Sequence, residues 1–124
     1  MLAILNLDHF KSVNDIYGHI VGDSLLEVIG REIQNAFQNM LVCRFGGDEF
    51  CIIAKLDGQN LINRLNAFLK FLHQKEFTEA KISLTCSAGI CCQPMNSLEE
   101  LIRKADSNLQ EAKRLGRDRM VTDL

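Results

Sequence analysis

Proline and tryptophan are scarce in this sequence, and long apolar runs are absent from it. One proline and no tryptophan occur in 124 residues, so no proline-rich linker separates two domains. No apolar stretch approaches the ~20 residues of a membrane-spanning helix, and no basic region precedes the apolar opening residues as in a signal peptide. We therefore expect one domain, residues 1–124, that makes no membrane contact of its own.

The chain also lacks a dominant charge and a clustered metal-binding motif. Lysine and arginine number 14 against 16 acidic residues, and the net charge of -2 excludes a broad basic surface for nucleic acid. Any anion site would depend on a few placed cations. The five cysteines form no CxxC pair, and the three histidines are not spaced to complete a zinc site. Mostly buried, reduced thiols are the simplest interpretation, and they indicate a cytoplasmic protein.

Hydrophobic periodicity predicts alternating strands and helices. Capping boxes mark the starts of two predicted helices, at Ser24 with Glu27 and at Ser97 with Glu100. Two short apolar runs on either side of residues 46–49 predict a β-hairpin. Together these elements favour an α+β sandwich with a central antiparallel sheet flanked by helices. The predicted strands are 2–7, 41–45, 50–54, 82–92 and 120–122, and the predicted helices are 10–17, 22–37, 60–74 and 97–114.

Two adjacent acids, Asp48 and Glu49, lie at the tip of the predicted hairpin. Like charges held together repel each other, and a divalent cation relieves that repulsion. Gly46 and Gly47, directly before them, allow the backbone to approach a substrate closely. An ordinary polar hairpin turn, in which glycine and aspartate are common, explains the same cluster equally well.

Further polar residues have both a functional and a structural interpretation. Lys113 and Arg117, four apart near the end of the last predicted helix, can hold a polyphosphate from one helical face, or they can simply complement the helix C-terminus. Asn14, His19 and Asp23 surround two glycine turns. An amide with a carboxylate suits guanine, whose N1–H and N2–H₂ donate and whose O6 accepts, although local helix capping is the commoner role of such residues.

Three ordered motifs shift the balance towards function. Residues 7–19 and 22–23 resemble the pattern D-x-D-x-F-K-x-x-N-D-x-x-G-H-x-x-G-D after its first position. Residues 44–50 read RFGGDEF, and residues 105–117 resemble the closing pattern A-D-x-A-L-Y-x-A-K-x-x-G-R. Together they cover the chain almost end to end. On these motifs the chain resembles the GGDEF domain, the catalytic module of bacterial diguanylate cyclases.

The resemblance implies a fold and a reaction. The fold would be that of nucleotidyl cyclases and the polymerase palm, with a ferredoxin-like core. In the reaction, two GTP condense to cyclic di-GMP and two pyrophosphates are released. Each domain of an antiparallel homodimer would bring one GTP, and the 3′-hydroxyl of one GTP would attack the α-phosphorus of the other. Two metal ions, Mg²⁺ or Mn²⁺, would assist this step.

Carried over by position, the resemblance also implies the roles of individual residues. Asp48 is expected to be a metal ligand and the site of base chemistry, with Glu49 beside it. The carbonyl of Leu7 is expected to reach the metal. The residues expected to bind GTP are Asn14 and Asp23 at guanine with His19 nearby, Lys11, Lys113 and Arg117 at the phosphates with backbone amides near Phe10, and Gly46 and Gly47 at the hairpin.

Four departures from the family pattern bear on activity. Asn6 stands where the family has its first metal-binding aspartate, and its amide oxygen carries no charge to balance the cation. The two positions of the family's product-inhibition motif, R-x-x-D, are Phe37 and Met40, so we expect that site to be absent. Gln110 replaces the usual tyrosine of the closing motif, and the helix that normally precedes the first strand is missing. We expect a fragment of a longer bacterial signalling protein.

Three functions follow from these observations. The first is a diguanylate cyclase domain, cut from a chain that also carries a sensor or an EAL domain. The second is a GTP-binding regulatory domain that has lost catalysis and acts on a neighbour such as an EAL phosphodiesterase. The third is a dimerising scaffold without a ligand. Asn6 favours the second, and the intact GGDEF sequence with its basic partners favours the first.

Overall fold

The computed structural model describes residues 1–44, 46–55, 58–77 and 80–123. A five-stranded sheet forms its centre, and a two-stranded sheet lies apart from it. In chain order the elements are β1 (Leu2–Leu7), α1 (Phe10–Tyr17), α2 (His19–Ala36), β2 (Leu41–Arg44), β3 (Glu49–Ile53), α3 (Gly58–Gln74), β4 (Glu76–Phe77), β5 (Ile82–Ser83), β6 (Cys86–Cys91), α4 (Leu98–Arg114) and β7 (Arg119–Thr122).

The first strand lies at the middle of the central sheet, whose order is β2-β3-β1-β6-β7. β1 runs antiparallel to β3 on one side and to β6 on the other, and β2 runs antiparallel to β3. The last strand, β7, pairs with β6 in parallel at the edge. The predicted α+β class with a largely antiparallel sheet is therefore confirmed.

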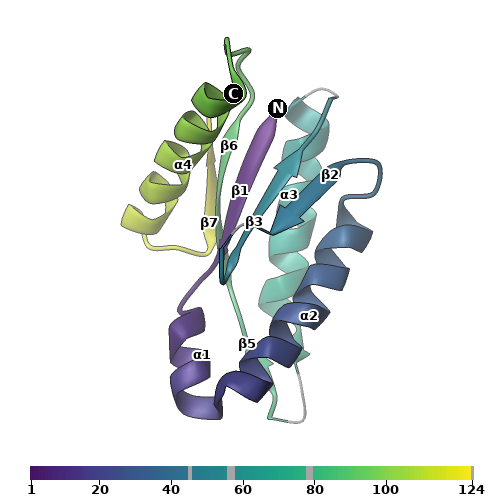
Figure 1. Ribbon diagram of the computed structural model, residues 1–124, viewed down its shortest axis with the longest axis vertical. Coiled ribbons are helices and arrows are strands. Elements are labelled where there is room, and N and C mark those ends of the chain that lie inside the picture. Colours follow the sequence, from purple (N-terminus) through teal and green to yellow (C-terminus); the bar gives the residue numbers. More distant parts are fainter. Residues whose placement is uncertain (45, 56–57, 78–79, 124) are drawn as a thin grey trace.

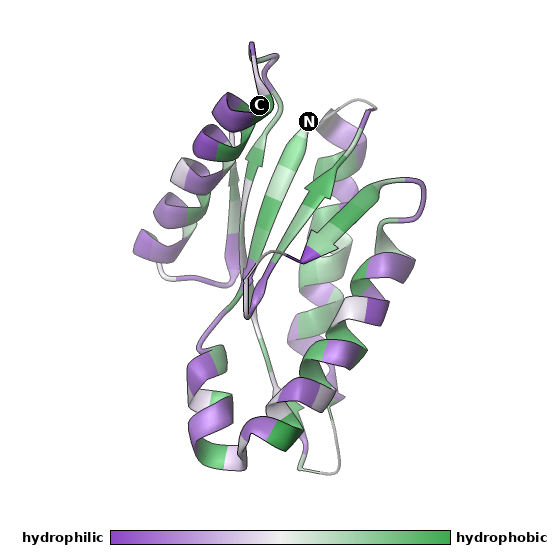
Figure 2. Ribbon diagram, in the orientation of Figure 1, coloured by the Kyte–Doolittle hydropathy of each residue, from purple (hydrophilic) through white to green (hydrophobic). Residues whose placement is uncertain are grey.

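Helices cover both faces of this sheet (Figure 1). Alternate side chains of β1 point to opposite faces, as they must in a strand. Leu5 and Leu7 join the larger apolar cluster with α2 and α3, whereas Leu2 and Ile4 join a smaller cluster with α4. Figure 2 shows the apolar strands at the centre and polar residues on the outer sides of the helices. In the described part of the chain, none of the helices is long and apolar enough to cross a membrane.

The last helix lies unusually close to the sheet at Gly89 of β6. An added Cβ at this glycine would stand 2.1 Å from the carbonyl oxygen of Ala105 and 2.2 Å from the backbone nitrogen of Leu109. The buried amide of Asn108 donates to the carbonyl of Ile90 over 2.8 Å in the same contact. Glycine therefore sets the distance between α4 and β6, and α4 leads directly into the chain segment of Arg117.

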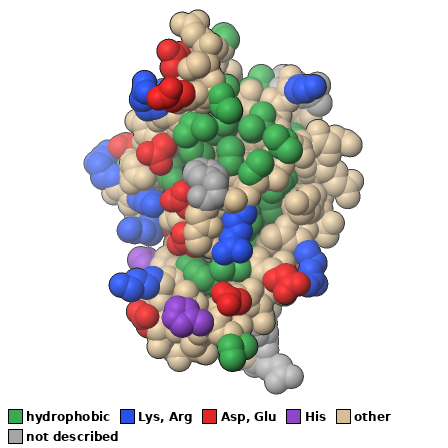
Figure 3. Space-filling model, viewed as in Figure 1, with side chains coloured by type: hydrophobic (Ala, Val, Ile, Leu, Met, Phe, Trp, Pro, Cys, Tyr) green, Lys and Arg blue, Asp and Glu red, His purple; other side chains and the backbone are tan. Residues whose placement is uncertain are grey.

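The α4 side of the sheet is only partly covered. Figure 3 shows hydrophobic side chains gathered near the centre of this face. Leu41 of β2 is 58% exposed, and on α4 the exposed fractions are 55% for Leu98 and 38% for Ile102. The apolar side chains of α4 are therefore fully buried only in its second half, where Ala105 and Leu109 contact the sheet.

Several predicted boundaries were wrong. The second helix begins at His19, so Ser24 lies inside it, and Ser24 and Glu27 form no capping box because a helix interior has no free amides to cap. Glu27 instead pairs with Arg31 over 2.7 Å. The single strand predicted at 82–92 is divided into β5 and β6, and β5 pairs with the unpredicted β4. Phe45, at the end of a predicted strand, lies outside the described residues.

Candidate active site

The end of β1 and the hairpin turn between β2 and β3 meet at one point. The backbone N–H of Leu7 donates to the carbonyl of Asp48 over 3.0 Å. One residue earlier, Asn6 is the direct cross-strand partner of Glu49, and only 9% of its surface is exposed. Cross-strand partners project to the same face of a sheet. The structure therefore brings the amide of Asn6 and the carboxylate of Glu49 to one face, beside the turn that carries Asp48.

The turn itself is held by an arginine that the sequence analysis did not single out. Arg44, the last residue of β2, donates from Nε to the carbonyl of Gly46 over 3.2 Å and from a terminal nitrogen to that of Gly47 over 2.8 Å. The side chain of Glu49 folds back over Gly46, because an added Cβ there would stand 3.1 Å from the Cβ of Glu49. Gly46 thus makes room for one of the two acids of the motif.

Asp8, two residues after Asn6, is a buried carboxylate that was assigned no role from the sequence. It is 4% exposed. Its Oδ1 accepts from the hydroxyl of Ser87 over 2.6 Å, and its Oδ2 accepts from the hydroxyl of Thr85 over 2.7 Å and from the N–H of Asp118 over 3.1 Å. Burial, aided by the negative charge of Asp8, raises the pKa of the neighbouring Cys86 thiol far above its ordinary value. Both oxygens of Asp8 are thus engaged in hydrogen bonds within the domain.

The corner between α1 and α2 brings Asn14 against Gly22. An added Cβ at Gly22 would stand 1.8 Å from Oδ1 of Asn14, so glycine is the residue that permits this contact. That Oδ1 is buried and has no hydrogen-bond partner among the described residues. Such atoms are rare in native proteins and indicate a missing partner. Asp23 follows Gly22 on the helix and is exposed, as is His19.

The two cations that were predicted to bind phosphate lie on different elements. Lys113 is in the last turn of α4, which ends at Arg114, and Arg117 lies beyond it in the connection to β7. The prediction that both share one helical face was therefore wrong. The N–H of Arg117 donates to the carbonyl of Ala112 and that of Gly116 to the carbonyl of Lys113. This is the Schellman arrangement, with Gly116 at its left-handed position, φ 118°.

The remaining candidates, Phe10 and Lys11, lie in the first turn of α1. Lys11 is exposed in the first turn of α1, and Phe10, which opens that helix, is buried. His9 adopts a left-handed conformation, φ 56°, at the bend between β1 and α1. Among the described residues, no three His, Cys, Asp or Glu side chains converge as a metal site. The oxygen donors at the turn are instead two carboxylates, the amide of Asn6 and backbone carbonyls.

Comparison with known proteins identifies the family of this chain. The sequence model described as "Diguanylate cyclase, GGDEF domain" matches residues 1–119. The chain belongs to the GGDEF domain family. The expected family is thereby confirmed, and with it the expectation that the chain has the fold of that family.

Relatives of this GGDEF domain include both cyclases and phosphodiesterases. Diguanylate cyclase DgcP of Pseudomonas aeruginosa is 37% identical over 126 residues, which cover 97% of this chain and 19% of DgcP. Cyclic di-GMP phosphodiesterase NbdA of the same species is 34% identical over 122 residues, which cover 94% of this chain and 16% of NbdA. The GGDEF domain of DgcB from Caulobacter crescentus, solved in complex with c-di-GMP, matches with a TM-score of 0.90 at 26% identity, over 98% of this chain and 75% of that chain. The chain thus spans less than a fifth of either curated relative.

The positions of the family's product-inhibition motif are occupied differently in this GGDEF domain. Phe37 is 1% exposed and belongs to the larger core, where its ring lies 5.8 Å from that of Phe68. Met40 is partly buried and packs against the same core. Neither side chain carries a charge, so these two positions offer no cation and no carboxylate to a ligand.

Proposed function

We propose that this domain binds GTP and condenses two GTP molecules to cyclic di-GMP. The observation that carries the proposal is the hydrogen bond from the N–H of Leu7 to the carbonyl of Asp48, which joins the first motif to the GGDEF turn. The match to DgcP over nearly the whole chain supports the same activity. In this reaction the 3′-hydroxyl of one GTP attacks the α-phosphorus of the other, and pyrophosphate leaves.

Guanine recognition is assigned to the corner of α1 and α2. The unpartnered Oδ1 of Asn14 would accept from a guanine N–H, and the carboxylate of Asp23 would accept from another, with His19 nearby. Adenine presents a lone pair at N1, so it would leave the Asp23 carboxylate facing an acceptor. A polar group left unpaired once the bound base shields it from water costs about 1–3 kcal/mol, which corresponds to roughly one to two decades in affinity.

Phosphate binding is assigned to the cations around the site. Lys11, Lys113 and Arg117 would neutralise the triphosphate, together with the backbone amides near Phe10. Gly46 and Gly47 are exposed at the turn and leave the backbone open to a close approach. In the described part of the chain, no ion pair involves any of these three cations, so their charges are available to a ligand.

The donor set at the turn fits a hard divalent cation. Mg²⁺ or Mn²⁺ takes oxygen ligands, and those available here are the carboxylates of Asp48 and Glu49, the carbonyl of Leu7 and the amide oxygen of Asn6. The ion would stabilise charge on the reacting phosphates. Asp48 would accept the proton of the attacking hydroxyl, with Glu49 beside it. Asn6 supplies oxygen without charge, so we expect slower turnover than in a domain with aspartate at this position.

A catalytically impaired, GTP-binding regulatory domain is the second candidate. Asn6 is the observation that favours it, and the similarity to the phosphodiesterase NbdA is consistent with a neighbouring EAL domain. In either case we propose a cytoplasmic bacterial domain within a longer protein, whose other segments include a sensor or an EAL domain. For catalysis, a second GGDEF domain would complete an antiparallel dimer.

Two measurements separate these candidates. Incubation with GTP and Mg²⁺, followed by chromatography of the nucleotides, should yield cyclic di-GMP, and Asp48→Ala should abolish it. Calorimetric titration with GTP and with ATP should show a preference for GTP. GTP binding without any product would favour the regulatory function, and equal affinities for the two nucleotides would refute the guanine assignment.

A further inference from the structure

The connection between α4 and β7 has an unusual backbone. Arg117 and Asp118 are consecutive and both adopt the left-handed conformation, with φ of 65° and 50°. Residues other than glycine rarely adopt this conformation, and it persists only where surrounding contacts hold it. The segment follows directly on the Schellman turn of α4, so the position of Arg117 depends on what fixes these two residues.

Every backbone donor of the two residues is engaged. The N–H of Arg117 donates to the carbonyl of Ala112 over 3.0 Å, and the N–H of Asp118 donates to Oδ2 of Asp8 over 3.1 Å. The carbonyl of Arg117 accepts from Nε of Arg119 over 3.0 Å. The guanidinium of Arg117 has no partner among the described residues. The backbone is thus held while the cation is left available.

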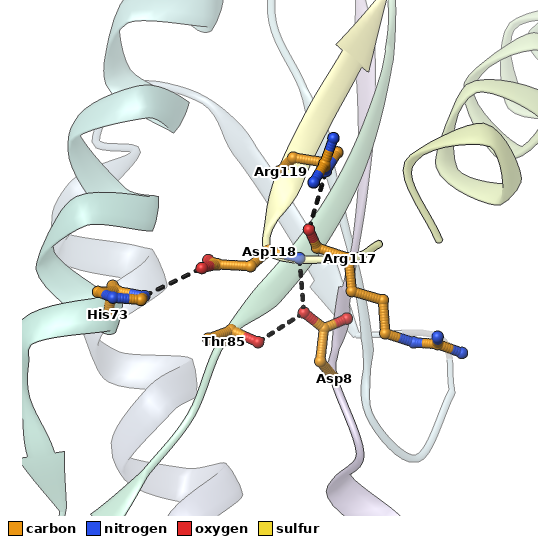
Figure 4. A network of polar contacts seen from close by, with 6 residues as sticks. All are labelled: Asp8, His73, Thr85, Arg117, Asp118 and Arg119. Carbon is orange, nitrogen blue, oxygen red and sulfur yellow. Dashed lines mark hydrogen bonds and ion pairs between the residues drawn. The ribbon is translucent and has the colours of Figure 1, made fainter. Parts of the chain in front are cut away.

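Asp8 is the only one of these partners that comes from the first motif. Figure 4 shows its carboxylate between Thr85 and the backbone of Asp118, with the side chain of Arg117 extending away from that of Asp118. Asp118 points to the other side, where its Oδ2 lies 3.0 Å from Nδ1 of His73. In the described chain no lysine or arginine pairs with Asp8, so its charge is balanced by hydrogen-bond donors alone.

We propose that Asp8 is a positioning residue, which fixes the left-handed segment 117–118 and thereby directs the guanidinium of Arg117 to the triphosphate of GTP. This inference rests on the proposed function, because that function makes Arg117 a phosphate ligand. A charged acceptor binds the Asp118 amide more tightly than a neutral one does. Asp8 directly follows Leu7, whose carbonyl is proposed to bind the metal. One short segment would therefore position both a metal ligand and the cation that binds the phosphates.

A purely structural role for Asp8 predicts a different outcome. Its carboxylate also links β1 to β6 through Ser87 and Thr85, so its loss would lower stability in any case. A structural defect would weaken all nucleotide binding to a similar degree. Misplacement of Arg117 would weaken only ligands that carry the outer phosphates, since guanine is held by other residues.

The test compares GMP with the α,β-methylene analogue of GTP, which cannot be turned over, by calorimetry. Asp8→Ala should weaken binding of the analogue by about tenfold, the loss expected for one misplaced charged contact, and change GMP affinity by less than about twofold. Asp8→Asn, which retains a neutral oxygen for the Asp118 amide, should restore part of the loss. Ser87→Ala is the matched control: it removes the contact to Oδ1 and leaves the contact to the segment, so analogue affinity should stay unchanged.

A double variant and hydrogen exchange complete the test. In the Arg117→Ala background, Asp8→Ala should cause no further loss of analogue affinity, because the residue it positions is gone. Additive losses, or equal losses for GMP and the analogue, would overturn the positioning role while leaving the nucleotide site intact. In the unmodified protein the Asp118 amide should exchange slowly with solvent, and free exchange would overturn the role whether or not Asp8→Ala folds. If the unmodified protein binds neither nucleotide, the proposed function itself is wrong.

Discussion

Replacement of Gly22 by alanine should lower the nucleotide selectivity of this domain without lowering its stability. Gly22 lies inside α2, where alanine is favoured over glycine by about 1 kcal/mol. Its added Cβ would stand 1.8 Å from Oδ1 of Asn14 and 3.6 Å from Cζ of Phe10. Contacts of a Cβ become ordinary beyond about 3.4 Å, so the amide of Asn14 must retreat by about 1.6 Å.

The two consequences have opposite signs. The substitution stabilises the helix, and the displaced amide of Asn14 lies at the end of a flexible side chain that can move. Thermal unfolding should therefore show little loss of stability, or a gain. The amide can no longer accept from guanine, which should lower GTP affinity by about 1–3 kcal/mol and reduce the preference over ATP.

Gly30→Ala is the matched control for this experiment. Gly30 lies in the same helix, and its added Cβ would meet only Cε1 of Phe50 at 3.9 Å. It should gain helix stability in the same way and leave GTP affinity unchanged. If Gly22→Ala binds GTP as tightly and as selectively as Gly30→Ala, Asn14 does not read guanine, and the assignment of this corner is wrong.

Three further predictions concern the metal, the helix position and the thiols. Asn6→Asp should destabilise the protein in metal-free buffer and stabilise it with GTP and Mg²⁺ while raising turnover; an equal shift of the melting temperature in both buffers would place Asn6 away from the metal. Gly89→Ala should cost more than about 2 kcal/mol in urea unfolding, because its Cβ meets the backbone of α4 and cannot be accommodated by a side chain moving; a smaller loss would mean that α4 shifts freely. Burial, with a smaller contribution from the charge of Cys43, raises the pKa of Cys51 to about 11 from 9.0, whereas Cys43 itself is exposed. At pH 8 a thiol reagent followed by mass spectrometry should therefore label Cys43 well before Cys51, and the stability contributed by the buried neutral thiol, present below pH 9, should be lost between pH 9 and 11.

Local sequence signals predicted those parts of the fold that local interactions determine. Ser97 accepts from the N–H of Glu100 over 3.2 Å and begins α4 as predicted. At Ser24 the same signal was wrong: α2 begins at His19, and Val21 of the added turn packs against the core. A capping box adds only about 1 kcal/mol, so burial of a helix face overrides it.

The same distinction applies to the candidate site: short motifs predict some of its residues, whereas contacts between residues distant in sequence are not predicted. The acids of the hairpin and the glycine before Asp23 were readable from short motifs. The partners of Asp8 were not, since Ser87 and Asp118 are 79 and 110 residues away in sequence. The one available signal was the type of residue: an aspartate directly after a buried and mostly apolar strand, in a position where burial without donors would be costly.

The burial of Phe37 has a consequence for how this domain could acquire feedback control. An arginine at this position would have to place its guanidinium in the apolar core against Phe68, or expose a cavity by turning outward. A buried, unpaired charge costs several kcal/mol, a large part of the stability of a domain of this size. Acquiring the arginine of this motif would therefore require repacking of the contact between Phe37, at the end of α2, and Phe68 of α3.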